Sequence, residues 1–169
     1  MRRTLDLLYD AAAWLAAIAM IGVLAMVLAS IVTRQIGVNF PGTDAYAGYS
    51  MAAAGFLALA HTLKHNEHIR VTLILGRLKG RALHGLEMWA LSAAVLLSGL
   101  FAFYAVRLSW QSHEIGDIST SNDATPLWLP QIGMAIGTVI LFIALVDEWW
   151  LEYKGRRVVV ESEEALHNE

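Results

Sequence analysis

Residues 11–33 read AAAWLAAIAMIGVLAMVLASIVT, and not one of them carries a charge. Three further charge-free runs follow, at 45–63, 88–106 and 124–146, so that each run holds 19 to 23 residues. A helix rises about 1.5 Å per residue, which gives each run roughly 28 to 35 Å, and the hydrocarbon core of a bilayer is about 30 Å thick. The sequence therefore predicts an all-α integral membrane protein with four transmembrane helices.

The composition excludes several classes of function. The chain is 57% hydrophobic, and its longest polar segments are about 20 residues, too short for a water-soluble domain. It has no cysteine, no GxxxxGK[ST] phosphate loop, no HExxH and no serine nucleophile elbow. We therefore expect no enzymatic activity, no cofactor and no nucleic-acid partner, and we expect membrane lipids as the surroundings.

The basic residues predict an orientation. Arg34 and Arg107 alone lie in the first and third loops, whereas the other ten of the 12 lysines and arginines lie in the second loop and at the two termini. Positive charge stays on the cytoplasmic side during insertion, so both termini are predicted to be cytoplasmic in the bacterial inner membrane. Tryptophans favour the headgroup level and agree with this orientation, at positions Trp14, Trp89, Trp110, Trp128, Trp149 and Trp150.

A single membrane domain is expected over residues 1–157. Its predicted spans are 11–33, 45–63, 88–106 and 126–147, followed by an acidic tail at 158–169 to which we assign no function. Within the second loop, apolar residues at helical spacing oppose Arg70, Arg77 and Arg81. This pattern predicts a short amphipathic helix on the cytoplasmic surface at 71–83, either as a brace or docking element or as a lipid-anchored loop.

Small residues mark two faces where helices could approach closely. The fourth span contains Gly133 and Gly137 in a GxxxG motif, and the second contains Gly48 and Ala52. Either face could pack within the chain or against another protein, with packing inside the chain as the default.

Arg34 closes the first span and Asp44 opens the second. We hypothesise that they pair across the hairpin; the alternative is that each side chain reaches water separately.

The predicted spans carry no charge near their middle, where a proton relay or a coupling-ion site would be expected. The chain therefore reads as a membrane subunit that acts with a partner. Histidines provide a rival interpretation, because His61 and His84 could hold a haem between two helices in a respiratory membrane anchor. A zinc site from His61, His65 and His68 is a weaker alternative, and a scaffold for another complex is a third.

The residues resemble those of a known family, the DctQ-like small membrane subunit of tripartite ATP-independent periplasmic (TRAP) transporters. The size and topology fit, as do Arg34 at the end of the first span and the acidic Asp44 at the start of the second, where the family more often has glutamate. His68-Ile69-Arg70-Val71 is similar to the family's H-I-x-V signature. Trp128, Pro130 and Gly133 resemble its Leu/Trp/Pro start of the fourth span.

The resemblance implies a function that the residues alone do not. A large multi-span permease subunit would import an organic anion, often a carboxylate, with a sodium gradient, after a periplasmic substrate-binding protein has captured it. The small subunit would brace the permease and help the binding protein to dock. On this reading the candidate structural or interface residues are Arg34, Asp44, Gly48, Ala52, His68, Arg70, Trp128, Pro130, Gly133 and Gly137.

Overall fold

The computed structural model describes residues 2–38, 40–64, 81–120 and 123–155. In these ranges four long helices carry the fold: α1 (Arg2–Gln35), α2 (Thr43–Lys64), α4 (Arg81–Ile115) and α5 (Trp128–Tyr153). The β-structure of the described residues is one isolated bridge between Ile118 and Pro126. The predicted all-α fold with four long helices is confirmed.

Three of these helices are long and apolar enough to cross a membrane: α1 over Thr4–Gln35, α4 over Leu83–Ile115, and α5 over its whole length. The fourth, α2, has 22 residues and is less apolar, because alanine and glycine replace larger side chains and because it contains Tyr46, Tyr49 and His61. The helices α1 and α4 are longer at both ends than the charge-free runs, and α5 extends beyond its run to Tyr153. Charged residues at these ends do not stop a helix that has packing partners.

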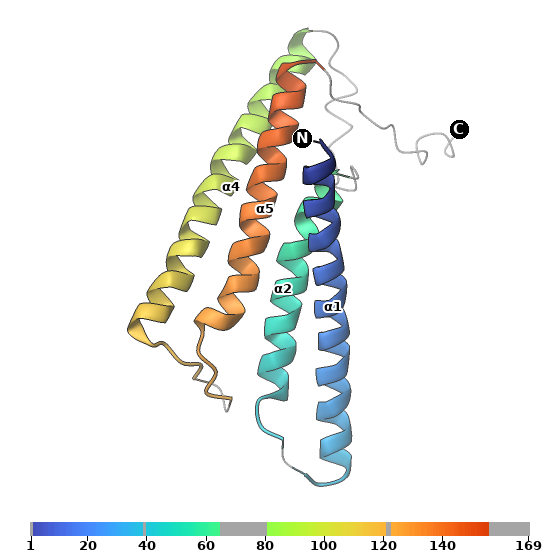
Figure 1. Cartoon of the computed structure of the whole chain (residues 1–169), viewed down its shortest axis with the longest axis vertical. Helices are drawn as coiled ribbons and strands as arrows, with labels where there is room; N and C mark the ends of the chain where they lie inside the picture. Colours follow the sequence, from blue (N-terminus) through green and yellow to red (C-terminus); the bar gives the residue numbers. More distant parts are fainter. Residues whose placement is uncertain (1, 39, 65–80, 121–122, 156–169) are drawn as a thin grey trace, which may run out of the picture.

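The helices stand in a single row in the order α1, α2, α5, α4 (Figure 1). Extensive packing joins α1 to α2, α2 to α5 and α5 to α4, whereas α1 scarcely meets α5. The start of α1 and the end of α5 lie at one end of the helices, which we call the terminal end. The end of α1, the start of α2, the end of α4 and the start of α5 lie at the other, the loop end (Figure 1). A row of helices does not enclose a core as a closed bundle does, so many large apolar side chains are exposed.

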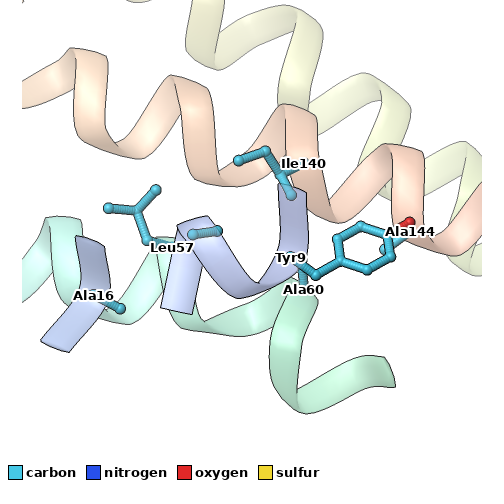
Figure 2. Close-up of a cluster of buried hydrophobic side chains, with 7 residues drawn as sticks. Tyr9, Ala16, Leu57, Ala60, Ile140 and Ala144 are labelled. Atoms are coloured by element: carbon cyan, nitrogen blue, oxygen red, sulfur yellow. The ribbon is translucent and has the colours of Figure 1, made fainter. Parts of the chain in front are cut away.

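The principal buried cluster lies where α1, α2 and α5 converge. It contains Tyr9, Ala12 and Ala16 of α1, Leu57 and Ala60 of α2, and Ile140 and Ala144 of α5 (Figure 2). Most of these side chains are alanines, so the helices approach closely and gain dispersion contacts between backbones, as expected in lipid. This packing explains why α1 begins at Arg2: Leu5, Leu8 and Tyr9 continue the contact before the charge-free run starts.

Tryptophans near the helix ends have the spacing of a bilayer core. Twenty-one residues separate Trp89 from Trp110 on α4, a rise of about 32 Å, close to the thickness of a bilayer core. Trp128 and Trp149 have the same separation on α5. Because indole rings favour the headgroup level, these pairs mark the two faces of the membrane.

The predicted interfacial helix at 71–83 lies largely outside the described residues, and its last positions, Arg81 to Leu83, begin α4. The acidic tail at 158–169 also lies outside them.

Candidate functional site

The GxxxG motif of α5 packs inside the chain, against α2. A Cβ added at Gly133 would lie 2.9 Å from the Ala53 Cβ, and one at Gly137 would lie 2.5 Å from the Phe56 carbonyl carbon. Carbon atoms that are not bonded to each other do not approach so closely. The helix α5 can therefore pack this tightly against α2 only because positions 133 and 137 are glycine. The default interpretation of this face therefore agrees with the geometry.

The second small-residue face has no such partner in the described chain. A Cβ at Gly48 or Gly55 would meet nothing within 4 Å, and Ala52 is exposed. These residues line a shallow apolar groove of about 550 Å³ together with Met51, Phe56 and Leu59. We call this groove the open α2 face. An inner helix of the row thus presents a small-residue surface that the described residues leave uncovered.

Arg34 and Asp44 do not pair as hypothesised. They line the same pocket at the loop end, of about 380 Å³, which lies between the end of α1 and the start of α2. Among the described residues the ion pairs join His61 to Asp10, Lys64 to Asp6 and His84 to Glu152. The Asp44 carboxylate instead accepts a hydrogen bond from the Ser30 hydroxyl at 3.4 Å, and Arg34 is exposed. Both side chains are solvent-accessible, so little is gained by holding them together.

Sequence reasoning missed a polar cluster at the loop end. The Tyr49 hydroxyl lies 2.9 Å from the Ser119 hydroxyl and 3.2 Å from the Asp123 carboxylate, and the Thr125 and Tyr46 hydroxyls lie 3.1 Å apart. Gly42 has φ +88°, and a Cβ there would lie 2.7 Å from that of Asp123. These contacts fix the loop 116–127 to the start of α2. The signal was the two tyrosines in a helix otherwise rich in alanine.

The loop-end cluster also sets the charge of Asp123. The hydroxyl of Thr125, and after it that of Ser119, holds the pKa of the Asp123 carboxyl below its usual value of 3.8, against partial desolvation, which raises it. Asp123 therefore remains ionised to lower pH than an ordinary aspartate.

Trp128 and Pro130 lie where α5 begins. The Trp128 ring lies 5.1 Å from the His113 ring of α4, and its carbonyl accepts a hydrogen bond from Ser109 at 3.5 Å. Pro130 occupies the first turn of α5, where a backbone N–H has no partner within the helix and proline is tolerated. Trp128 therefore positions the start of α5 against α4.

The histidines of the haem alternative are separated. His61 of α2 lies 3.8 Å from the Asp10 carboxylate of α1, whereas His84 of α4 lies 2.7 Å from that of Glu152 on α5. Each imidazole therefore lies beside a carboxylate of a different neighbouring helix. His68 and Arg70, and His65 of the zinc alternative, lie outside the described residues.

The fold and these surfaces define a multi-pass helical membrane protein, with a small-residue face left open on a central helix. Residues 23–155 match the family model described as tripartite ATP-independent periplasmic transporters, DctQ component, and the chain belongs to this family. It is accordingly a TRAP transporter small membrane component of the inner membrane, in a family of transporter components and not of enzymes. No curated protein matches the chain.

Proposed function

We propose that this chain is the small subunit of a sodium-driven TRAP transporter that imports organic anions, most of them carboxylates. It braces the large permease subunit and helps to dock the periplasmic substrate-binding protein. The observation that supports this proposal is the family match over residues 23–155 on a fold whose central helix keeps one face uncovered.

The open α2 face is the proposed contact with the large permease subunit. The groove is lined by apolar and small side chains, so that a second apolar helix could fill it. Gly48, Ala52 and Gly55 leave room for the backbone of another helix to approach. A partner helix that fills this groove would complete the packing of α2 on the side opposite to its contacts with α1 and α5.

The loop end is the proposed contact with the binding protein. The hydroxyl cluster ties Ser119 and Asp123 to α2, and fixing these residues lowers the entropy lost on docking. Glu114 and Asp117 are exposed there and could meet a basic patch on a soluble partner. With both termini cytoplasmic, as the basic residues predict, this surface faces the periplasm.

Transport itself is assigned to the partner. The charged residues of the described helices lie toward the helix ends, for example Asp10 and Arg34 on α1 or Asp44 and Lys64 on α2. A coupling-ion site at the middle of the membrane needs polar groups or broken helices there. The proposed role of this chain is therefore mechanical support and docking.

The experiment that tests the brace is a double substitution, Gly48→Leu with Ala52→Leu, in a tagged chain co-expressed with its neighbouring transporter genes. Two leucines would fill the groove, and we expect the large subunit to be lost from the purified complex. The matched control is Ala17→Leu with Ala25→Leu on exposed positions of α1, which should retain the partner. Retention of the partner by the α2 variant would refute this contact.

Docking is tested separately by charge reversal at Glu114 and Asp117 to lysine. We expect weaker binding of the substrate-binding protein and slower uptake, with the membrane complex intact. Unchanged affinity and uptake would remove the loop end from the docking surface.

A further inference from the structure

The pocket at the loop end holds two opposite charges that do not neutralise each other. Arg34 and Asp44 both line it, and in the described part of the chain the Arg34 guanidinium makes no hydrogen bond or ion pair. Asp44 has only the contact of 3.4 Å from Ser30. With a volume of about 380 Å³, the pocket has room for a small polar group between a cation and an anion.

The depth of the pocket places it at the membrane surface. Twenty residues separate Trp14 from Arg34 on α1, a rise of about 30 Å, which equals the thickness of the hydrocarbon core. Arg34 therefore lies at headgroup level when Trp14 lies at the opposite interface.

Exposed apolar side chains accompany the charged ones. Val38 and Phe40 line the pocket and are each more than half exposed, and Ile31, Val32 and Ile36 are equally exposed at the end of α1 and just after it. A site for a soluble ion would leave these side chains in water at a cost, whereas acyl chains would cover them. Charged walls beside exposed apolar side chains favour an amphiphile with a zwitterionic head.

We propose that this pocket binds the headgroup of phosphatidylethanolamine. The Arg34 guanidinium contacts the phosphate, the Asp44 carboxylate accepts hydrogen bonds from the ammonium group, and the acyl chains run along the exposed face of α1. The choline headgroup has no N–H to donate to Asp44, and phosphatidylglycerol has no cation, so both bind more weakly. This proposal does not depend on the transporter assignment.

The test is native mass spectrometry of the purified chain, titrated with phosphatidylethanolamine, phosphatidylcholine and phosphatidylglycerol that share the same acyl chains. For the native chain we expect about a tenfold preference for phosphatidylethanolamine, the effect of one charge-assisted hydrogen bond. Asp44→Asn keeps the shape and should reduce that preference to about one. Arg34→Gln should weaken the binding of all three lipids. The matched control, Arg107→Ala on an exposed position of α4, should behave as the native chain.

Three outcomes would overturn the proposal. One is equal binding of the three lipids to the native chain. Another is displacement of the lipid by soluble glycerophosphoethanolamine at equal concentration, which would make the pocket a solute site. The third is an Arg34→Gln chain that binds all three lipids as tightly as the native chain, which would show that Arg34 does not contact the headgroup.

Discussion

Two glycines of neighbouring helices, Gly137 on α5 and Gly55 on α2, differ in their surroundings: the first is tightly packed and the second is open. Gly137 touches the backbone of Phe56, whereas Gly55 has nothing within 4 Å of the position that a Cβ would occupy. The motif pattern does not separate these cases, because GxxxG spacing occurs at buried and exposed faces alike. Only the arrangement of the helices shows which glycine permits close packing inside the chain.

Gly137→Ala should destabilise the chain by about 1–3 kcal/mol, because the new methyl group meets a backbone carbonyl that cannot rotate away. Gly55→Ala is the control and should leave stability unchanged in the isolated chain. The measurement is the midpoint of thermal unfolding in mild detergent. Equal midpoints for the two variants would contradict the packing described for α5 on α2.

The lowered pKa of Asp123 predicts that acid weakens the attachment of its loop to α2. Its pKa in the folded chain is lowered, so the stabilisation from its ionised form is complete above the ordinary value of 3.8 and is lost as the pH falls below that value. We expect the loop 116–127 to exchange amide hydrogens faster relative to α5 once the pH passes below about 3.8. Asp123→Asn should remove most of this pH dependence; an unchanged pH profile in that variant would exclude Asp123 as its source.

At the scale of the elements, the loop 116–127 depends on α2 for its conformation. Removing the hydroxyl in Tyr49→Phe leaves Ser119, which is buried, without that contact and should cost about 1 kcal/mol. Faster hydrogen exchange in the loop, at constant exchange in α1, is the expected result. Tyr104→Phe on α4, at an exposed position, is the control and should change neither. Equal loop exchange in both variants would show that Tyr49 does not hold the loop.

The number and approximate positions of the four helices were predictable from the lengths of the charge-free runs. The start and end of α2 fall within two residues of the predicted span, because charged residues and a turn bound it closely. The N-terminal extension of α1 was not predictable. Asp10 ends the charge-free run in sequence, but in space Asp10 lies 3.8 Å from His61 and Asp6 forms an ion pair with Lys64. The predicted Arg34–Asp44 pair does not form, although the two residues are close in sequence. An ion pair between two exposed side chains gains little electrostatic energy and loses side-chain entropy.

At the scale of the whole molecule, the arrangement of the helices in a single row determines which helix faces stay uncovered. In a closed bundle of four helices all four would meet around one core, whereas in the row α2 packs against α1 and α5 and keeps a third face uncovered by the described residues (Figure 1). The order of the helices could not be read from the sequence, because an apolar pattern does not say which helix is the neighbour. The open α2 face is the surface on which the proposed partner contact depends.

The orientation of the row can be measured directly, because the chain has no cysteine. Ile118→Cys in the third loop and Leu7→Cys near the start of α1 are both exposed positions. In intact spheroplasts an impermeant maleimide should label the first and not the second, and lysis should expose the second. Labelling of Leu7→Cys before lysis would reverse the predicted topology.

The central claim is that this chain is completed by a large permease subunit. The most direct test is the mass of the complex purified in mild detergent from its native membrane, with identification of each component. The account predicts a one-to-one complex with a membrane protein of many more spans, without visible absorbance. Recovery of this chain alone, or with a coloured redox protein, would contradict it.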